Sequence, residues 1–311
     1  MLSVRNLINT TDLTVSDITQ ILDTARTFEQ INARTIKKLP TLRGRTIVNL
    51  FLEPSTRTKS SFELACKRLG ADTLSISGSS SSVVKGESLV DTIQTVDAMS
   101  VDMFICRARF AGSPEIIERT TSARVINAGD GKHAHPTQAL LDLYTIRKRF
   151  GRIEGLRVGI VGDCLHSRVV GSLAPALTKM GARVTLVGPQ TFLPARPDAL
   201  GADATADLDA LLPDLDVVYM LRVQNERLEG DAIPSTREYA MLYGLDGRRA
   251  RLMRPDAVVM HPGPVNRGVE LTSEVVDASF SLITNQVNAG VSVRMAAIYL
   301  LLGGEGNAIS D

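Results

Sequence analysis

Short runs rich in valine and isoleucine alternate with amphipathic segments along this chain of 311 residues. This alternation is typical of βα units, in which buried parallel strands are joined by helices that cover the sheet. The predicted strands are Arg45–Leu52, Asp72–Ser77, Asp102–Cys106, Arg124–Asn127, Arg157–Val161, Arg183–Val187, Val217–Leu221 and Ala257–His261. The predicted helices are one that begins after Thr14, then Ser55–Leu69, Glu87–Met99, Pro136–Phe150, Arg168–Met180 and Asn288–Leu302. The chain is therefore expected to be an α/β protein.

The pattern restarts after Gly151–Gly155, which breaks a helix just before a new strand. A chain of this length also suits two domains of roughly 100–200 residues each. We predict two doubly wound parallel-sheet domains, residues 1–150 and 151–287, joined by interdomain helices. The last helix, at about 288–303, is expected to pack back on the first domain. Ligands are expected where strand ends meet the cleft between the domains.

The charge balance is near zero, with 35 basic and 34 acidic side chains. No overall field favours nucleic acid or an anionic membrane, so any anion site must be local. The three cysteines, Cys66, Cys106 and Cys164, are scattered, which fits a reduced cytosolic protein better than a disulfide scaffold. The most apolar stretch, Met295–Leu302, is far shorter than the roughly 20 residues of a membrane span. We expect a cytoplasmic protein without a signal peptide.

The most informative motif is Pro54–Thr58, which reads Pro-Ser-Thr-Arg-Thr, follows a predicted strand and opens a predicted helix. The first N–H groups of a helix lack internal partners and point outward at the positive end of its dipole. Together with three hydroxyls and the guanidinium of Arg57, they would form a phosphate cradle without a Walker lysine or a glycine run. A capped helix with a surface arginine is the simpler alternative.

This motif and its continuation, Ser61-Phe62-Glu63, resemble the carbamoyl-phosphate signature of the carbamoyltransferase family. Further segments resemble motifs of the same family in the expected order, and several are typical of its aspartate branch: Val84–Ser88, Gly129–Gln138, Arg222–Arg227 and Met260–Pro264. The resemblance spans most of the chain. It implies an enzyme of de novo pyrimidine biosynthesis that transfers the carbamoyl group of carbamoyl phosphate to the α-amine of L-aspartate, giving N-carbamoyl-L-aspartate and phosphate.

The resemblance assigns most of the site residues to carbamoyl phosphate. The phosphate-binding residues are Ser55, Thr56, Arg57 and Arg107, and the carbonyl oxygen is approached by Thr58, Arg107 and His135. The carbamoyl NH2 group would donate to Gln138 and to backbone carbonyls near Pro262, Gly263 and Pro264. Donors aimed at a developing oxyanion usually contribute most to catalysis, roughly 3–4 kcal/mol each. The predicted catalytic residues are thus Arg57, Thr58, Lys85, Arg107 and His135.

A dicarboxylate substrate needs two cationic clamps. By resemblance, Arg168 binds the α-carboxylate of aspartate, and Arg222 with Gln224 binds the β-carboxylate. Arginine suits this task because its planar fork can grip a carboxylate at two points. From composition alone, Lys85 would lie in an ordinary surface loop. In the family, however, this loop crosses a subunit boundary, so that Lys85 meets both substrates and Ser81 meets the phosphate, which implies a homotrimer with shared active sites.

The chain departs from the family pattern after the key arginine, where the family commonly has His-Pro and this chain has Ala108-Arg109. Alignment on Asp102–Cys106 gives the oxyanion role to Arg107, but Arg109 is an additional cation and leaves open which guanidinium enters the site. No cofactor is expected, because Gly159–Asp163 lacks the G-x-G-x-x-G spacing of a dinucleotide site. No cluster has the spacing of a catalytic metal site either, so no metal is expected.

Three alternatives remain. A sister carbamoyltransferase would act on ornithine, but Arg222 would repel the distal cation of that substrate. A catalytically silent member could serve as a scaffold of a larger pyrimidine-pathway complex, and a nicotinamide oxidoreductase is nearly excluded by the absent glycine fingerprint. The sequence leaves open whether a regulatory chain or a dihydroorotase-like partner docks on the trimer.

Overall fold

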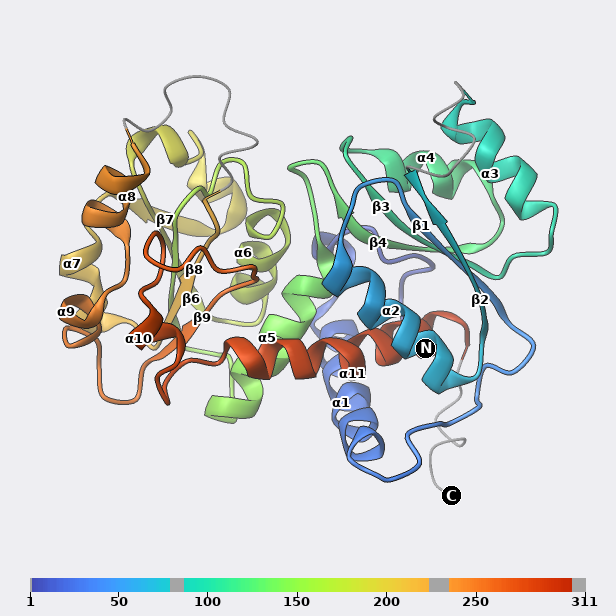
Figure 1. The fold of residues 1–311 in the computed structure, drawn as a ribbon, viewed down its shortest axis with the longest axis horizontal. Coiled ribbons are helices and arrows are strands. Elements are labelled where there is room, and N and C mark those ends of the chain that lie inside the picture. Colours follow the sequence, from blue (N-terminus) through green and yellow to red (C-terminus); the bar gives the residue numbers. More distant parts are fainter. Residues whose placement is uncertain (1, 79–86, 224–234, 304–311) are drawn as a thin grey trace. The chain divides into compact units, whose positions relative to one another are not determined.

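The computed structural model of the chain describes residues 2–78, 87–223 and 235–303. They form two compact units, the first made of Met1–Tyr144 with Asn288–Asp311 and the second of Thr145–Val287. Both boundaries fall inside long helices, α5 (Pro136–Phe150) and α11 (Ile283–Leu301). Each unit contains one parallel sheet flanked by helices, which confirms the predicted α/β class (Figure 1).

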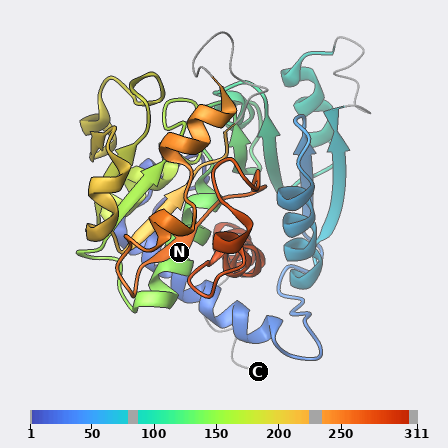
Figure 2. The ribbon, with the colours of Figure 1, turned by 60° about the vertical axis from the view of Figure 1, so that its left-hand side comes forward.

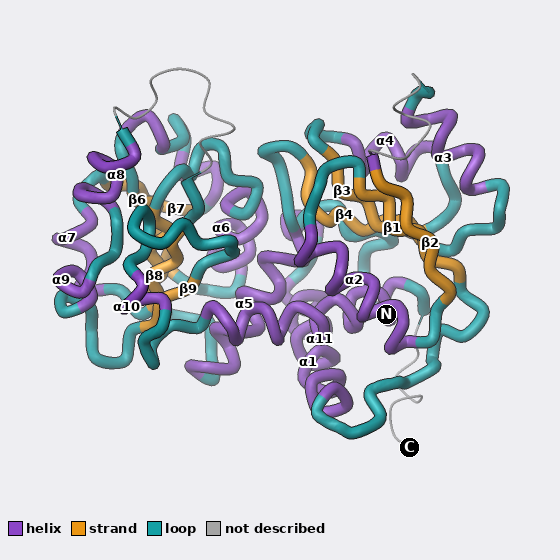
Figure 3. Tube along the Cα trace, viewed as in Figure 1, coloured by secondary structure: helices purple, strands orange, loops and turns teal. Residues whose placement is uncertain are grey.

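The sheet of the first unit has the strand order β2-β1-β3-β4, with all neighbours parallel (Figure 3). Its strands are β1 (Thr46–Phe51), β2 (Asp72–Ser77), β3 (Met103–Ala108) and β4 (Arg124–Asp130). Because crossovers between parallel strands are right-handed, α2 (Thr56–Leu69) covers one face, and α3 (Leu89–Asp97) and α4 (Ser113–Thr120) cover the other. Val48, Phe104 and Ile117 belong to the buried cluster on the α3 and α4 side.

Helix α1 (Val15–Asn32) packs on α11 in the same unit, although the two lie at opposite ends of the sequence. The rings of Phe28 and Tyr299 meet edge to face, with their centroids 5.7 Å apart. At the start of α1, Thr14 and Asp17 form a capping box in which each side chain accepts the backbone N–H of the other. The first unit therefore gains its last helix from the C-terminal part of the chain.

The sheet of the second unit has the strand order β7-β6-β5-β8-β9, again entirely parallel. Figure 2 draws this unit in colours from green through yellow to orange. Its strands are β5 (Arg157–Val161), β6 (Arg183–Val187), β7 (Ala202–Thr205), β8 (Val217–Met220) and β9 (Val258–Met260). Its helices are α6 (Val170–Lys179), α7 (Leu208–Leu211), α8 (Thr236–Tyr243), α9 (Gly247–Ala250) and α10 (Ser273–Val276). Short 3₁₀ turns at Thr10–Asp12, Gln190–Phe192, Pro197–Leu200 and Leu212–Asp214 complete the described elements of the chain.

The strands Asp72–Ser77, Arg157–Val161 and Arg183–Val187 and the helix Pro136–Phe150 have the predicted bounds. The last helix begins at Ile283, five residues before the predicted start, and the helix expected from Arg168 begins at Val170. Helices α4, α7, α8, α9 and α10 and strand β7 were not predicted, because each has eight residues or fewer and is too short for a clear periodic pattern. None of the described helices has both the length and the apolarity needed to cross a membrane.

Candidate functional site

The first part of the site is the start of α2, which follows β1 directly. Ser55 is the N-cap residue with an extended backbone, and among the described residues its side chain makes no capping hydrogen bond. Thr56 and Arg57 are exposed in the first turn, whereas Thr58 is buried. No acidic residue lies in this turn, so its outward N–H groups, hydroxyls and guanidinium together favour an anion.

Arg107 lies at the carboxyl end of β3, next to the strand that leads into α2. Arg107 is opposite Phe51 in the parallel pairing of β3 with β1. Its backbone carbonyl accepts the N–H of Leu52 at 2.8 Å. The guanidinium donates to the Ala128 carbonyl at 3.3 Å and lies 3.5 Å from the carboxylate of Glu53. The side chain is only 13% exposed, so this cation is held in place at the strand edge beside the α2 turn.

Arg109 has a different environment from Arg107. It follows the end of β3 and is exposed, in the turn that leads to α4. The pairing of β3 with β4 shifts register between Cys106 and Ala108, so the strand is irregular where the chain departs from the family pattern. Of the two cations, Arg107 is therefore the one that shares the strand edge with the phosphate-cradle motif.

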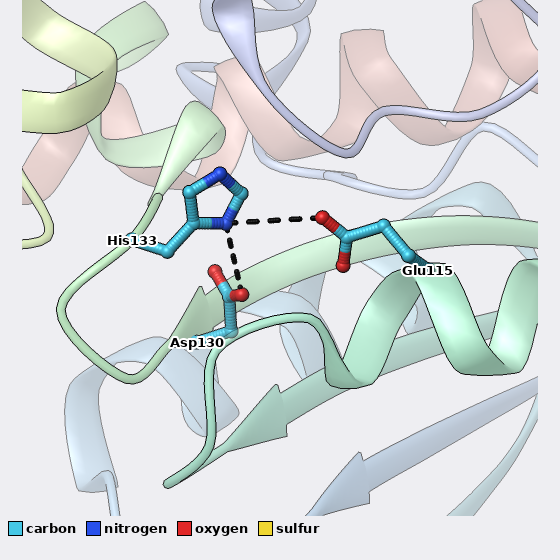
Figure 4. A group of neighbouring side chains, drawn as sticks. All are labelled: Glu115, Asp130 and His133. Carbon is cyan, nitrogen blue, oxygen red and sulfur yellow. Dashed lines mark hydrogen bonds and ion pairs between the residues drawn. The ribbon is translucent and has the colours of Figure 1, made fainter.

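The turn between β4 and α5 is organised by the buried carboxylate of Asp130. It accepts hydrogen bonds from the side-chain amide of Asn127 at 2.7 Å and from the N–H groups of Gly112 and Ala134 at 2.9 and 3.1 Å. Nδ1 of His133 lies 3.0 Å from the same carboxylate (Figure 4). The turn that ends at the predicted site residue His135 is therefore tied to β4 and to the start of α4.

Glu115 of α4 also approaches His133, with its carboxylate oxygen 3.9 Å from Nδ1 (Figure 4). Ligand atoms of Glu115, Asp130 and His133 lie within 4.8 Å of one another, a grouping that the sequence did not indicate because Glu115 comes from a separate segment. However, N–H donors of the protein already surround the Asp130 carboxylate. Hydrogen bonds within the turn thus account for the positions of Asp130 and His133, whereas Glu115 approaches from α4 at 3.9 Å.

His135 and Gln138 stand at the start of α5, at the end of the third adjacent strand. Both side chains are buried, and the His135 carbonyl accepts the N–H groups of Gln138 and Ala139 at 3.0 and 3.2 Å. The side-chain N–H of Gln138 donates to Asp142 at 3.1 Å. A carboxylate can only accept, so Asp142 orients the Gln138 amide and leaves its oxygen as the acceptor end. Since β1, β3 and β4 are neighbours, their ends bring these residues to one edge of the sheet.

The predicted clamps occupy the corresponding edge of the second unit. Arg168 is buried in the turn between β5 and α6. In this turn the backbone N–H of His166 donates to the side-chain carboxylate of Asp163 at 3.1 Å. Arg222 follows β8, the strand that pairs directly with β5. Parallel neighbours end at the same edge, so both arginines lie at the carboxyl edge of this sheet.

The segment His261–Pro264 follows β9, the next strand of the same sheet. Nδ1 of buried His261 accepts the Gly263 N–H at 2.8 Å, and its Nε2 lies 3.3 Å from Glu270. These contacts fix the imidazole tautomer with the proton on Nε2. The peptide bond between Gly263 and Pro264 is cis. The predicted residues Ser81, Lys85 and Gln224 lie outside the described residues.

The three cysteines are buried, so none is presented as a nucleophile. Burial raises the pKa of the Cys66 thiol to about 12 and raises the pKa values of Cys106 and Cys164 further. A thiol with so high a pKa is protonated at neutral pH and unreactive. The candidate site is therefore built from cations, hydroxyls, an amide and the imidazole of His135, not from thiols.

Two family models match the chain in sequence order. Residues 5–148 match the carbamoyl-P binding domain of aspartate/ornithine carbamoyltransferase, and residues 154–301 match its Asp/Orn binding domain. A protein of Desulforapulum autotrophicum named aspartate carbamoyltransferase catalytic subunit is 51% identical over 304 residues, covering 98% of this chain and 97% of that one. A Salinispora tropica protein of the same name is 54% identical, covering 97% and 99% of the two chains.

Solved structures of both branches are similar to this chain. Trypanosoma cruzi aspartate transcarbamoylase, in complex with N-(phosphonacetyl)-L-aspartic acid, superposes with a TM-score of 0.86 at 31% identity, covering 94% of each chain. Ornithine carbamoyltransferase from Pyrococcus furiosus also gives 0.86, at 28% identity, with 97% of this chain and 98% of that one covered. The fold therefore does not separate the two branches, and the side chains must do so.

Proposed function

The chain belongs to the aspartate/ornithine carbamoyltransferase family, and we propose that it transfers the carbamoyl group of carbamoyl phosphate to the amine of L-aspartate. The products are N-carbamoyl-L-aspartate and phosphate. This reaction is an early step of pyrimidine biosynthesis, which we place in the cytoplasm. The observation that carries the proposal is the chemistry of two strand edges, one in each unit. One bears a cradle for an anion at α2, Arg107, His135 and Gln138, and the other bears the two arginines that a dicarboxylate requires.

In the first unit, the start of α2 binds the phosphate of carbamoyl phosphate. Its N–H groups, the hydroxyls of Ser55 and Thr56 and the guanidinium of Arg57 are all donors, as a phosphate dianion needs. Arg107 reaches both the phosphate and the carbonyl oxygen, because it stands at the end of the adjacent strand. These contacts also stabilise the phosphate as it leaves.

The reaction places negative charge on the carbonyl oxygen when the amine of aspartate attacks the carbamoyl carbon. Thr58, Arg107 and His135 donate hydrogen bonds to this oxyanion, each worth roughly 3–4 kcal/mol in the transition state. His135 can donate from one nitrogen while neutral. The carbamoyl NH2 donates to the Gln138 oxygen, whose orientation Asp142 fixes, and to carbonyl groups of the Pro262–Pro264 segment.

The second substrate is aspartate and not ornithine because of the charges at the second strand edge. Arg168 binds the α-carboxylate, and Arg222 with Gln224 binds the β-carboxylate, where the distal ammonium of ornithine would be repelled. The ornithine branch typically carries a cysteine motif where this chain reads His261-Pro-Gly-Pro264. A cysteine-free segment with a rigid imidazole supports the aspartate branch.

The active assembly we propose is a homotrimer with shared sites, in which Ser81 and Lys85 of one subunit complete the site of its neighbour. Lys85 meets both substrates and Ser81 meets the phosphate. Regulatory or dihydroorotase-like chains remain candidate partners of such a trimer.

The direct test is carbamoyl-product formation from carbamoyl phosphate, with aspartate and with ornithine in parallel. Turnover is expected with aspartate alone, and Arg222→Ala should raise the KM for aspartate at least tenfold, because a charge-assisted bidentate contact is lost. The exposed Arg254, which pairs with Asp216 at 3.0 Å, provides a matched control, and Arg254→Ala should leave that KM unchanged. Turnover with ornithine would contradict the clamp assignment, and turnover with neither substrate would support a silent scaffold.

A further inference from the structure

Arg294 of α11 is a buried cation that none of the roles above uses. Its residue is 4% exposed, and its guanidinium lies over the ring of Phe62, 5.0 Å from the centroid. Among the described residues, Nε of Arg294 has no hydrogen-bond partner. A guanidinium this deep is costly unless its charge is compensated, so its presence calls for an explanation beyond packing.

Arg294 lies close to residues of two helices, α2 and α5, that each follow a proposed carbamoyl phosphate residue by one helical turn. Phe62, which it covers, lies four residues after Thr58 on α2. Asp142, the carboxylate that opposes its charge, lies four residues after Gln138 on α5 and accepts the side-chain N–H of Gln138. Residues four apart on a helix stack on the same face, so Arg294 and Asp142 lie behind side chains assigned to the ligand.

Helix α11 leaves room for this guanidinium. A Cβ atom at Gly290, four residues before Arg294, would lie 2.6 Å from one of its terminal nitrogens and 3.5 Å from Leu141. Any larger residue at position 290 would therefore displace the charged group. The space is filled by a cation where an aliphatic side chain could have packed.

The cations around Arg294 outnumber the carboxylates: the charges of Arg294, Arg107 and Arg57 are set against those of Asp142 and of Glu53, which lies 3.5 Å from Arg107. Burial lowers the pKa of the Arg294 guanidinium to about 10, Asp142 acts against this decrease, and the charges of Arg107 and Arg57 add to it. The group thus stays protonated at neutral pH, within electrostatic reach of the two arginines assigned to the phosphate. A dianion bound among these cations would supply the missing negative charge.

We propose that Arg294 is a positioning residue of the carbamoyl phosphate site, which acts without touching the ligand. Its buried charge raises the affinity of the α2 cradle for a phosphate dianion, and with Asp142 it fixes the orientation of the Gln138 amide. The negative charge of Asp142, by contrast, lowers the affinity for the phosphate dianion, while its carboxylate accepts the hydrogen bond that orients Gln138. The inference rests on the proposed function only in that the phosphate binds at the start of α2.

The test measures the dissociation constant of inorganic phosphate for the whole purified protein and three single-site variants. Arg294→Met keeps the volume and removes the charge, and should weaken phosphate binding about ten- to hundredfold. Asp142→Asn keeps an acceptor for Gln138 but removes the opposing charge, so it should bind phosphate as tightly as the unaltered protein or more tightly. Arg249→Met is the matched control, because Arg249 is equally buried but donates to Asp209 and to two carbonyl groups in the second unit.

If Arg294 and Asp142 had only a structural role, the results would differ. Changing either residue should then weaken phosphate binding and lower the melting temperature together. Parallel weakening in Arg294→Met and Asp142→Asn, or phosphate binding unaffected by Arg294→Met, would overturn the inference. If Arg294→Met does not fold, the double variant Asp142→Asn/Arg294→Met, which leaves neither charge without the other, is compared with Asp142→Asn. The double variant should bind phosphate about ten- to hundredfold more weakly than Asp142→Asn. Absence of phosphate binding by the unaltered protein would instead overturn the proposed site at α2.

Steady-state kinetics adds an independent readout. Arg294→Met should raise the KM for carbamoyl phosphate while leaving the KM for aspartate nearly unchanged. Asp142→Asn should mainly lower kcat, because the Gln138 amide can flip once its acceptor-only partner is gone. Equal effects of the two variants on both KM values would contradict separate roles in charge and orientation.

Discussion

His133 lies 3.0 Å from the buried carboxylate of Asp130, two residues before His135, and this contact helps to close the turn that carries the proposed oxyanion donor. The same carboxylate accepts two backbone N–H groups and the Asn127 amide. A fully bonded buried anion of this kind holds a loop rigid. The position of His135 therefore depends on a residue that does not itself reach the substrate.

We expect Asp130→Asn to lower kcat about tenfold or more, because an amide cannot accept from all of these donors and one or more N–H groups is left unpaired. Stability should decrease as well, by about 1–3 kcal/mol. Turnover assays and urea unfolding would measure the two effects. The comparison variant is His133→Asn, which removes the most exposed of the four contacts of the Asp130 carboxylate. It should lower kcat and stability much less than Asp130→Asn does. Full turnover in Asp130→Asn would show that the turn is held by other contacts.

Arg107→Ala should reduce turnover at least about a hundredfold, because it removes a donor to the developing oxyanion. Arg109→Ala should be mild, since that side chain is exposed in the following turn. Measuring kcat and kcat/KM for the two variants side by side decides between the cations. The opposite ranking would mean that the irregular end of β3 changes which guanidinium enters the site.

The sequence predicted the strand edges well because buried strands and helix starts are local features. Pro54–Thr58 lies at the start of α2, and the clamp arginines follow β5 and β8, as the alternation of strands and helices implied. By contrast, Arg294 occurs between apolar neighbours in a segment that reads as an ordinary core helix. Its placement over Phe62 and within electrostatic reach of Asp142 depends on how α11 packs against α2 and α5, and such tertiary contacts leave no local pattern. The group around Asp130 was missed for the same reason.

Shared sites can be tested by mixing two inactive proteins. Lys85→Ala and Arg57→Ala each remove one contribution to the proposed site, and the two residues would come from different subunits. After subunit exchange, some sites in a mixed trimer carry neither change, so partial activity should return. Exchange should be verified with differently tagged chains, and an Arg57→Ala and Arg107→Ala mixture serves as a control that should stay inactive. Exchange without recovery would indicate that each chain contains a complete site.

The N-terminal cap of α1 should make stability depend on acid pH. Asp17 is buried, which by itself raises its pKa, but hydrogen bonds from Ser3 and Thr14 outweigh this and lower the pKa from 3.8 to about 2. Because the folded-state pKa is depressed, the contribution of this carboxylate is present above about pH 4 and is lost as the pH falls towards 2. We expect Asp17→Asn to lower the free energy of unfolding by about 1 kcal/mol at neutral pH. Urea titrations would measure the difference in the free energy of unfolding between the variant and the unaltered protein. This difference should become smaller by about pH 3, whereas a constant difference would mean that the charge of Asp17 does not stabilise the cap.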